Sequence, residues 1–119
     1  MNVIKKQLDL KDELYYIKHL SIINPMLPIQ MTPKEIEVLG TFMSLKGDIA
    51  EEDRFGTTCR KIVKEKLGLS DGGLGNHLKS LKDKSFIYSL TNGKFTILDV
   101  LLADEEQQGY MFKIIKNFD

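Results

Sequence analysis

The sequence predicts an α+β chain that is mainly helical, in which three core helices lead directly into a short β-hairpin. Apolar side chains recur at helical spacing in residues 57–67 and again in residues 70–82, on either side of a glycine. An Asn-Gly pair then separates two short apolar runs, which is typical of a hairpin. At 119 residues the chain has the size of one domain with a single core.

The helix predicted over residues 57–67 is amphipathic. Gly68 follows it at the position where a helix end favours a residue with positive φ. The one cysteine, Cys59, excludes an internal disulfide, and its place on the apolar face indicates a small core residue. Basic side chains lie largely off the apolar face. The apolar positions are Cys59, Ile62, Val63 and Leu67, and the basic ones include Arg60, Lys61, Lys64 and Lys66.

The helix predicted over residues 70–82 begins with Ser70 as N-cap, and Leu69 and Leu74 take the N′ and N4 positions of a hydrophobic staple. Its buried stripe consists of Leu74, Leu78 and Leu81. The opposite face is small, polar and basic, with Gly72, Gly75, Asn76, Lys79 and Lys82.

The first core helix has the clearest start in the chain. Thr32 is the predicted N-cap, Pro33 occupies the first helical position, and Glu35 completes a capping box. Gly47 is expected to close this helix. The buried stripe is Ile36, Leu39, Phe42 and Met43. In the acidic connector that follows, residues 48–56, Ile49 could supply a short strand that pairs with the hairpin.

The hairpin is predicted from residues 86–90 and 95–98, which flank Thr91-Asn92-Gly93-Lys94. Asn-Gly between two apolar runs favours a type I′ turn, with positive φ at both central residues. The tip is short and offers one cation, Lys94, for a single phosphate contact.

This order of elements is that of a winged helix-turn-helix, a three-helix core plus a short β-hairpin wing. The run KIVKEKLGLSDGGLGNHLKSLKDKSFIYSLTNGKF resembles the helix-turn-helix and wing of MarR-type and related small winged-helix DNA-binding proteins. The resemblance covers residues 32–98, and LKSLKDKSFIY is its most specific part. Two departures are Ser85, where many relatives have glycine, and the short wing tip. The phrase GDIAEEDRFGTTCRKIVKEKLGLSDGGLGNHLKSLKDK also resembles small proteins of large tailed bacteriophages.

Two extensions flank this unit. In residues 1–31, Val3 to Leu10 could be a short strand, and Asp12 to Ile23 is predicted as an amphipathic helix that ends at Asn24 and Pro25. In residues 99–119, a helix is favoured over Val100 to Gln107, and Tyr110 to Ile115 has both helical spacing and strand composition. The two strand candidates could pair within one chain or between two. These extensions are the natural elements for a homodimer.

The net charge is zero, but its distribution is uneven. Residues 57–84 carry seven basic and three acidic side chains, an excess of four positive charges that coincides with the helix-turn-helix. No apolar run approaches the ~18 residues of a membrane span, and the first residues lack a signal peptide's apolar core. We therefore expect a cytoplasmic protein, or a component of a virion.

Motifs for catalysis or cofactor binding are missing from the sequence. It contains no Gly-rich phosphate loop, nucleophile elbow, H-E-x-x-H or C-x-x-C. His19 and His77 stand apart from other ligand-type residues and are interpreted as structural. The acids at 51–53 lack the spacing of a calcium loop. We expect no enzyme activity, metal, cofactor or small-molecule ligand.

The function that this pattern favours is sequence-selective binding of double-stranded DNA, in transcriptional regulation, with residues 70–82 in the major groove. Asn76 would recognise adenine, and Lys79 would reach guanine or a phosphate. Glycines in the first turns allow close backbone approach, and the helix N-terminus is an anion site, although Asp71 opposes one there. After the N-cap Ser70, the first turn and a half contains Gly72, Gly73 and Gly75, and the phosphate contacts are Arg60, Lys61, Lys64, Lys82 and Lys94.

The alternative keeps the fold without DNA: a protein–protein adaptor or a structural part of a larger assembly, for instance a phage particle. Zero net charge, the acidic connector and the short hairpin tip favour this alternative.

Overall fold

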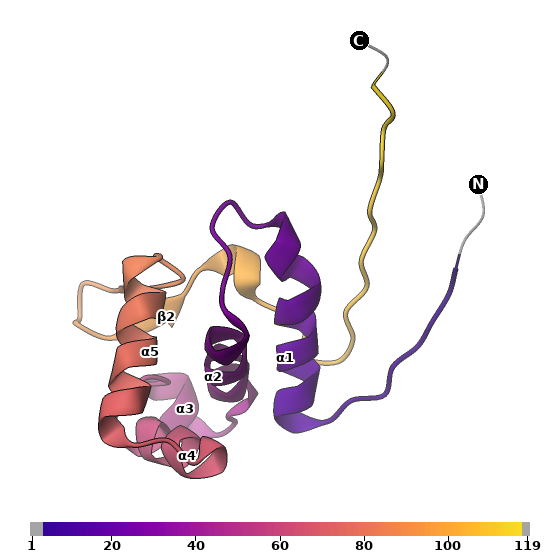
Figure 1. Cartoon of the computed structure of the whole chain (residues 1–119). Helices are drawn as coiled ribbons and strands as arrows, with labels where there is room; N and C mark the ends of the chain where they lie inside the picture. The colour runs from indigo at the N-terminus through magenta and orange to yellow at the C-terminus, as the bar shows by residue number, and fades with distance from the viewer. Residues whose placement is uncertain (1–3, 118–119) are drawn as a thin grey trace.

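The computed structural model describes residues 4–117, and within them the chain is mainly helical with a small antiparallel sheet. Figure 1 shows the elements in order. They are α1 (Asp12–Ile23), α2 (Pro33–Ser44), α3 (Asp48–Glu52), α4 (Thr57–Leu67), α5 (Asp71–Asp83), β1 (Ile87–Ser89) and β2 (Phe95–Ile97), with short 3₁₀ turns at Asn24–Met26 and Asp99–Leu101.

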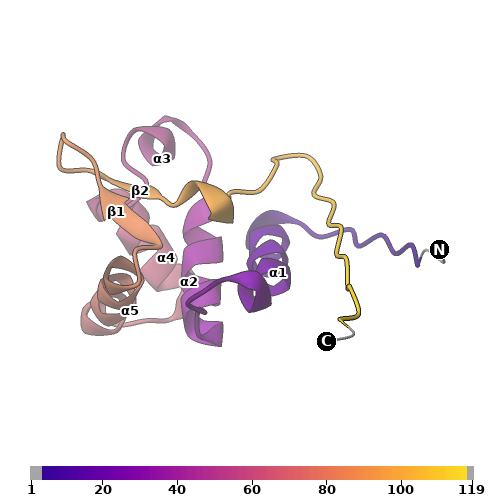
Figure 2. The same ribbon diagram turned by 90° about the horizontal axis from the view of Figure 1, so that it is seen from above.

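Helix α2 lies at the centre of the molecule. α1 packs along one side of it and α4 and α5 along the other, and the hairpin follows α5 (Figures 1 and 2). This position explains why α2 is buried on almost every face, including Val38, Leu39 and Phe42, which have no exposed surface. The core continues into the other elements through Leu20, Leu78, Leu81, Ile87 and Leu101.

The start of α2 confirms the predicted capping box. The Thr32 hydroxyl accepts a hydrogen bond from the Glu35 amide, and the Glu35 carboxylate accepts one from the Thr32 amide at 2.8 Å. The predicted end is wrong by one turn, because α2 finishes at Ser44. Gly47, with φ of 101°, instead precedes the first residue of α3.

The turn between α4 and α5 is confirmed in its details. Gly68 has a left-handed backbone with φ of 63°, and the amide of Leu69 reaches back to the Lys64 carbonyl at 3.0 Å. Ser70 is the N-cap of α5, and its hydroxyl accepts a hydrogen bond from the Gly73 amide at 3.0 Å. Leu74, Leu78 and Leu81 are buried as predicted.

The hairpin forms, but its turn differs from the prediction. Among residues 91–94, positive φ occurs at Gly93 alone. A type I′ turn needs positive φ at both central residues, so the predicted turn type is wrong. The amide of Gly93 donates to the Leu90 carbonyl at 2.9 Å, and the amide of Leu90 donates to the Lys94 carbonyl at 2.7 Å. The connection is therefore a three-residue loop with glycine in the left-handed position. The Asn92 side chain accepts a hydrogen bond from the Lys94 amide, and this bond stabilises the three-residue loop.

Two element predictions outside the core helices are wrong. The expected strand at Ile49 is absent, because residues 48–52 form α3 and the Ile49 side chain is largely exposed. The expected helix over residues 100–107 shrinks to the single turn Asp99–Leu101. Three consecutive acids at 104–106 would have stood at its C-terminal end, where the helix dipole disfavours negative charge.

The two chain ends also differ from the strand hypothesis. Helix α1 is confirmed, but residues 4–10 and 110–115 belong to no strand in the described chain, and Val3 lies outside the described residues. His19 in α1 binds the C-terminal segment. Its Nε2–H donates to the Leu101 carbonyl at 2.9 Å, so Nδ1 accepts from the Tyr110 hydroxyl at 2.6 Å. Burial lowers the pKa of His19, which favours this neutral form.

Within residues 4–117, every helix is too short or too polar to cross a membrane.

Candidate nucleic-acid interface

The outward face of α5 is open. Gly72, Gly75, Asn76 and Lys79 are all exposed, and a Cβ placed at Gly72 or Gly75 would meet nothing within 4 Å. Both chain ends leave the body beside α1, on the other side of α2 from α5 (Figures 1 and 2). Neither the termini nor the acids of α3 cover this face in the described chain.

A hollow of about 360 Å³ lies beside this face, between α4 and α5. Four predicted phosphate-contact or first-turn residues line it together: Arg60, Lys61, Lys64 and Gly75. The other lining residues are Thr57, Asp71, Leu74 and Leu78. The structure thus gathers the basic positions of α4 at the entrance to the α5 face.

Two of these cations already have partners in the chain. The Lys64 ammonium lies 2.8 Å from the Asp71 carboxylate, and this hydrogen bond raises the pKa of Lys64 and lowers the pKa of Asp71. The Arg60 Nε–H donates to the Phe55 carbonyl at 2.7 Å. Asp71 is almost fully exposed, so its pair with Lys64 can open at little cost to meet a phosphate.

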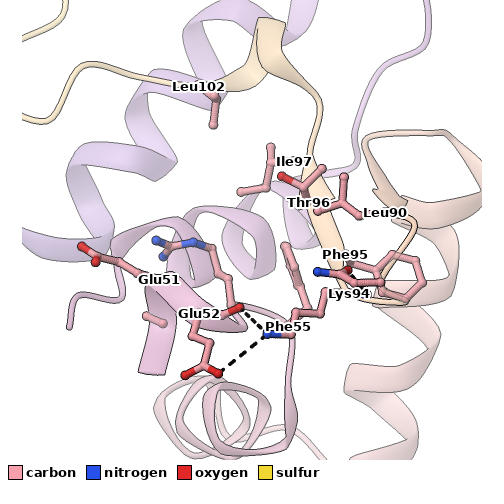
Figure 3. A pocket seen from close by; sticks show the side chains of 12 residues that line it. Glu51, Glu52, Phe55, Leu90, Lys94, Phe95, Thr96, Ile97 and Leu102 are labelled. Atoms are coloured by element: carbon pink, nitrogen blue, oxygen red, sulfur yellow. Dashed lines mark hydrogen bonds and ion pairs between the residues drawn. The ribbon is translucent and has the colours of Figure 1, made fainter. Parts of the chain in front are cut away.

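The other two predicted phosphate contacts lie outside the hollow. The Lys82 ammonium stands 4.2 Å above the centre of the Phe95 ring, which joins the end of α5 to β2. The Lys94 ammonium donates to the Glu52 carbonyl at 3.1 Å and lies 3.9 Å from its carboxylate (Figure 3). Lys94 is therefore directed toward α3, so the structure does not bring it together with the cations of α4.

Two lysines of the candidate interface remain without a partner. Lys61 and Lys79 are exposed, and neither makes a hydrogen bond or ion pair within residues 4–117. They are the cations on this surface that an approaching phosphate or base meets without displacing another group.

The first turn of α5 divides the predicted glycines into two kinds. A Cβ at Gly73 would lie 3.1 Å from the Ser70 hydroxyl, so Gly73 sits against the cap itself. Gly72 and Gly75 face open space and leave the backbone of α5 bare. The sequence suggested that the backbone at all three glycines could approach another surface closely, but Gly72 and Gly75 are the two that face open space.

Sequence reasoning missed one residue of this surface. Thr57 is exposed, begins α4 and lines the hollow, where its hydroxyl can donate to an anion. The signal that could have identified it is spacing, because Thr57 lies one helical turn before Arg60 and Lys61.

Comparison with known proteins found no matching family model, no matching curated protein and no matching solved structure.

Proposed function

We propose that the chain is a winged-helix protein that binds double-stranded DNA sequence-selectively, as transcription regulators do, with α5 as its recognition helix and the hairpin as its wing. Three features support this architecture: the glycine turn between α4 and α5, the packing of both helices on α2, and the hairpin that follows α5 at once.

In this proposal, α5 enters the major groove with its open face. The amide of Asn76 pairs with N6 and N7 of an adenine, and Lys79 reaches a guanine or a phosphate. Lys61, Arg60 and Lys64 contact phosphates, the last after leaving Asp71. The bare backbone at Gly72 and Gly75 allows the helix to lie close to the DNA.

The observation that carries the proposal is the exposure of α5 on the side opposite its leucines. The apolar stripe of α5 is buried, while Asn76 and Lys79 on the opposite face are exposed and have no hydrogen bond or ion pair within residues 4–117, which leaves them available for a groove. The hollow lined by Arg60, Lys61 and Lys64 adds positive charge along the edge of that face.

The test is a titration of the full chain with duplex DNA at several salt concentrations. We expect a Kd of about 1 µM or lower at low salt that weakens steeply as salt is added, because phosphate contacts release counterions. Lys79→Glu should weaken binding at least about tenfold, and Lys61→Ala should reduce the salt slope by about one.

The matched control is Lys18→Glu, the same charge change on an exposed residue of α1. It should leave the affinity almost unchanged. The proposal would be contradicted if no DNA binding were detected at low salt. It would also be contradicted if Lys18→Glu and Lys79→Glu weakened binding equally. The melting temperature of each variant shows whether the fold is intact.

One observation favours the alternative, a winged-helix adaptor for another protein. Lys64, Lys82 and Lys94 all interact with groups of the chain itself, which weakens the positive field that a DNA-binding surface needs. If DNA binding is absent while the fold is intact, the same α5 face becomes the candidate surface for a protein partner.

A further inference from the structure

Within residues 4–117, no strand lies against the outer edge of β2. In the pairing with β1, Thr96 lies opposite Tyr88. The Leu98 amide donates to the Phe86 carbonyl, so Phe86 and Leu98 form a hydrogen-bonded pair, and Tyr88 and Thr96, two positions along, form the next one. By the alternation of antiparallel pairs, the N–H and C=O of Phe95 and Ile97 point away from β1. None of these four groups has a hydrogen bond in the described chain.

Helix α3 faces this edge across a hollow that residues of both elements line. Because residues 48–52 are helical, they offer the edge no extended backbone to pair with. Ile97 lines the hollow beside this edge, and backbone N–H and C=O groups are normally paired in folded proteins. The edge therefore favours the addition of an extended segment.

A groove lies along this edge, and Figure 3 shows the side chains that line its first part. It consists of a hollow of about 250 Å³ between the hairpin and α3 and a second of about 160 Å³ that continues toward Tyr16. Both are lined by Glu51, Arg54, Ile97 and Leu102, which makes them parts of one groove. An elongated groove beside an unpaired strand fits an extended peptide.

The chain itself carries such a segment. Residues 111–117 follow the contact between Tyr110 and His19, are not part of a helix or strand, and leave the body on the α1 side (Figures 1 and 2). Their apolar side chains are exposed, with Ile114 at 97%, and strand-forming types predominate. The exposed apolar residues are Met111, Phe112, Ile114 and Ile115.

In the described chain, the groove offers unpaired carboxylates to a lysine of the segment. Glu51 and Glu105 line the groove, and neither carboxylate has a partner within residues 4–117. The three cations that line the groove already donate to oxygens of the chain: Arg54 to the carbonyls of Phe42 and Leu45, Lys46 to the Tyr16 hydroxyl and Lys94 to the Glu52 carbonyl. Lys113 lies in the middle of the exposed apolar run, where it can face these acids.

We propose that residues 111–116 of a second copy of this chain add to the β2 edge as a third strand, reciprocally, in a two-fold dimer. The chain's own segment is held elsewhere, because the Tyr110–His19 hydrogen bond directs it away from the groove. Reciprocal exchange uses the same two surfaces in both copies and closes as a dimer. The proposal does not depend on DNA binding.

The first test is amide hydrogen exchange with NMR detection at concentrations below and above the dimer Kd. In the dimer, the amides of Phe95 and Ile97 should exchange at least about tenfold more slowly than in the monomer, because each gains a strand partner. Thr96 is the internal control, since its amide already faces β1 and should not change. Mixed labelled and unlabelled chains identify which copy provides the strand.

The second test is a charge exchange followed by sedimentation equilibrium. Glu51→Lys and Lys113→Glu should each weaken the dimer about tenfold, because each places like charges together twice in a two-fold dimer. The double variant should return to within about threefold of the natural chain. Glu65→Lys, an equal change on the exposed surface of α4, is the control and should have no effect.

Three results would overturn this proposal. One is a chain that remains monomeric at millimolar concentration with fast exchange at Phe95 and Ile97. Another is a monomer in which those amides are slow through contacts with its own segment. The third is a dimer that neither charge reversal weakens.

Discussion

At the scale of single residues, Glu35 connects the start of α2 to the end of α5. Its buried carboxylate accepts hydrogen bonds from the Lys84 ammonium at 2.6 Å, the Ser80 hydroxyl at 2.7 Å and the Thr32 amide at 2.8 Å. Burial alone would raise the pKa of Glu35. The hydrogen bonds outweigh this effect, that of Lys84 most strongly, and hold the pKa at about 2.

This pKa predicts how the free energy of unfolding depends on pH. Because the folded pKa lies below the ordinary value of 4.5, the contribution of Glu35 is complete above pH 4.5 and is lost as the pH falls toward 2. The loss should be roughly 3 kcal/mol. Urea unfolding of the natural chain and Glu35→Gln at pH 6, 4 and 2.5 measures it, and the difference between them should shrink toward low pH. A constant difference would refute this role for Glu35.

Ser85 is the second residue with a measurable consequence. It ends α5 with φ of 63°, and the hydrogen bonds Ser85 N–H to Lys82 and Phe86 N–H to Leu81, both at 3.0 Å, form a Schellman motif. Glycine adopts this conformation without the Cβ clash. Ser85→Gly should therefore raise the free energy of unfolding by up to about 1 kcal/mol. Chemical denaturation measures this, and destabilisation by Ser85→Gly would show that the position is unstrained.

Residue-level features could be predicted from the sequence where they are local. The caps at Thr32, Gly68 and Ser70 depend on partners within a few positions, and all three are confirmed. The bonds from Ser80 and Lys84 to Glu35 span 45 and 49 positions, so no spacing in the sequence could indicate them. The same holds for Lys82 above Phe95.

At the scale of elements, α1 and α2 approach closely at Gly40. A Cβ there would lie 2.9 Å from the Ile17 amide nitrogen and 3.0 Å from its Cα, so any side chain would push the helices apart. Gly40→Ala should lower the free energy of unfolding by about 1–3 kcal/mol through overpacking. Gly75→Ala is the matched control, because it adds the same methyl group in open space and should stabilise α5 by about 1 kcal/mol. Thermal or urea unfolding compares the two; equal effects would exclude the close packing.

Elements with strong periodicity and caps could be predicted, and short ones could not. Helices α1, α2, α4 and α5 and the hairpin lie where the sequence placed them, within a turn. The segment at 48–52 is only five residues, too short for periodicity to separate helix from strand. Its last three residues, Ala50, Glu51 and Glu52, are good helix formers, and they outweigh the single β-branched Ile49.

At the scale of the whole molecule, the sequence could place charges along the chain but not in space. The positive excess of residues 57–84 lies on α4, α5 and the residues that flank them, yet four of its lysines, Lys64, Lys66, Lys82 and Lys84, interact with groups of the chain. Which group each lysine binds depends on how the elements pack, and the order of charges along the chain does not give that packing. The C-terminal segment shows the same limit, since its contact between Tyr110 and His19 spans 91 positions.

An NMR titration of the labelled full chain with duplex DNA at low salt shows which surface meets the DNA. If α5 is the recognition helix, amide shifts should change at Gly72, Gly75, Asn76 and Lys79 on α5 and at Lys61 on α4, and added salt should reverse the changes. Unchanged spectra at excess DNA, or changes confined to α1 and the chain ends, would contradict this role of α5.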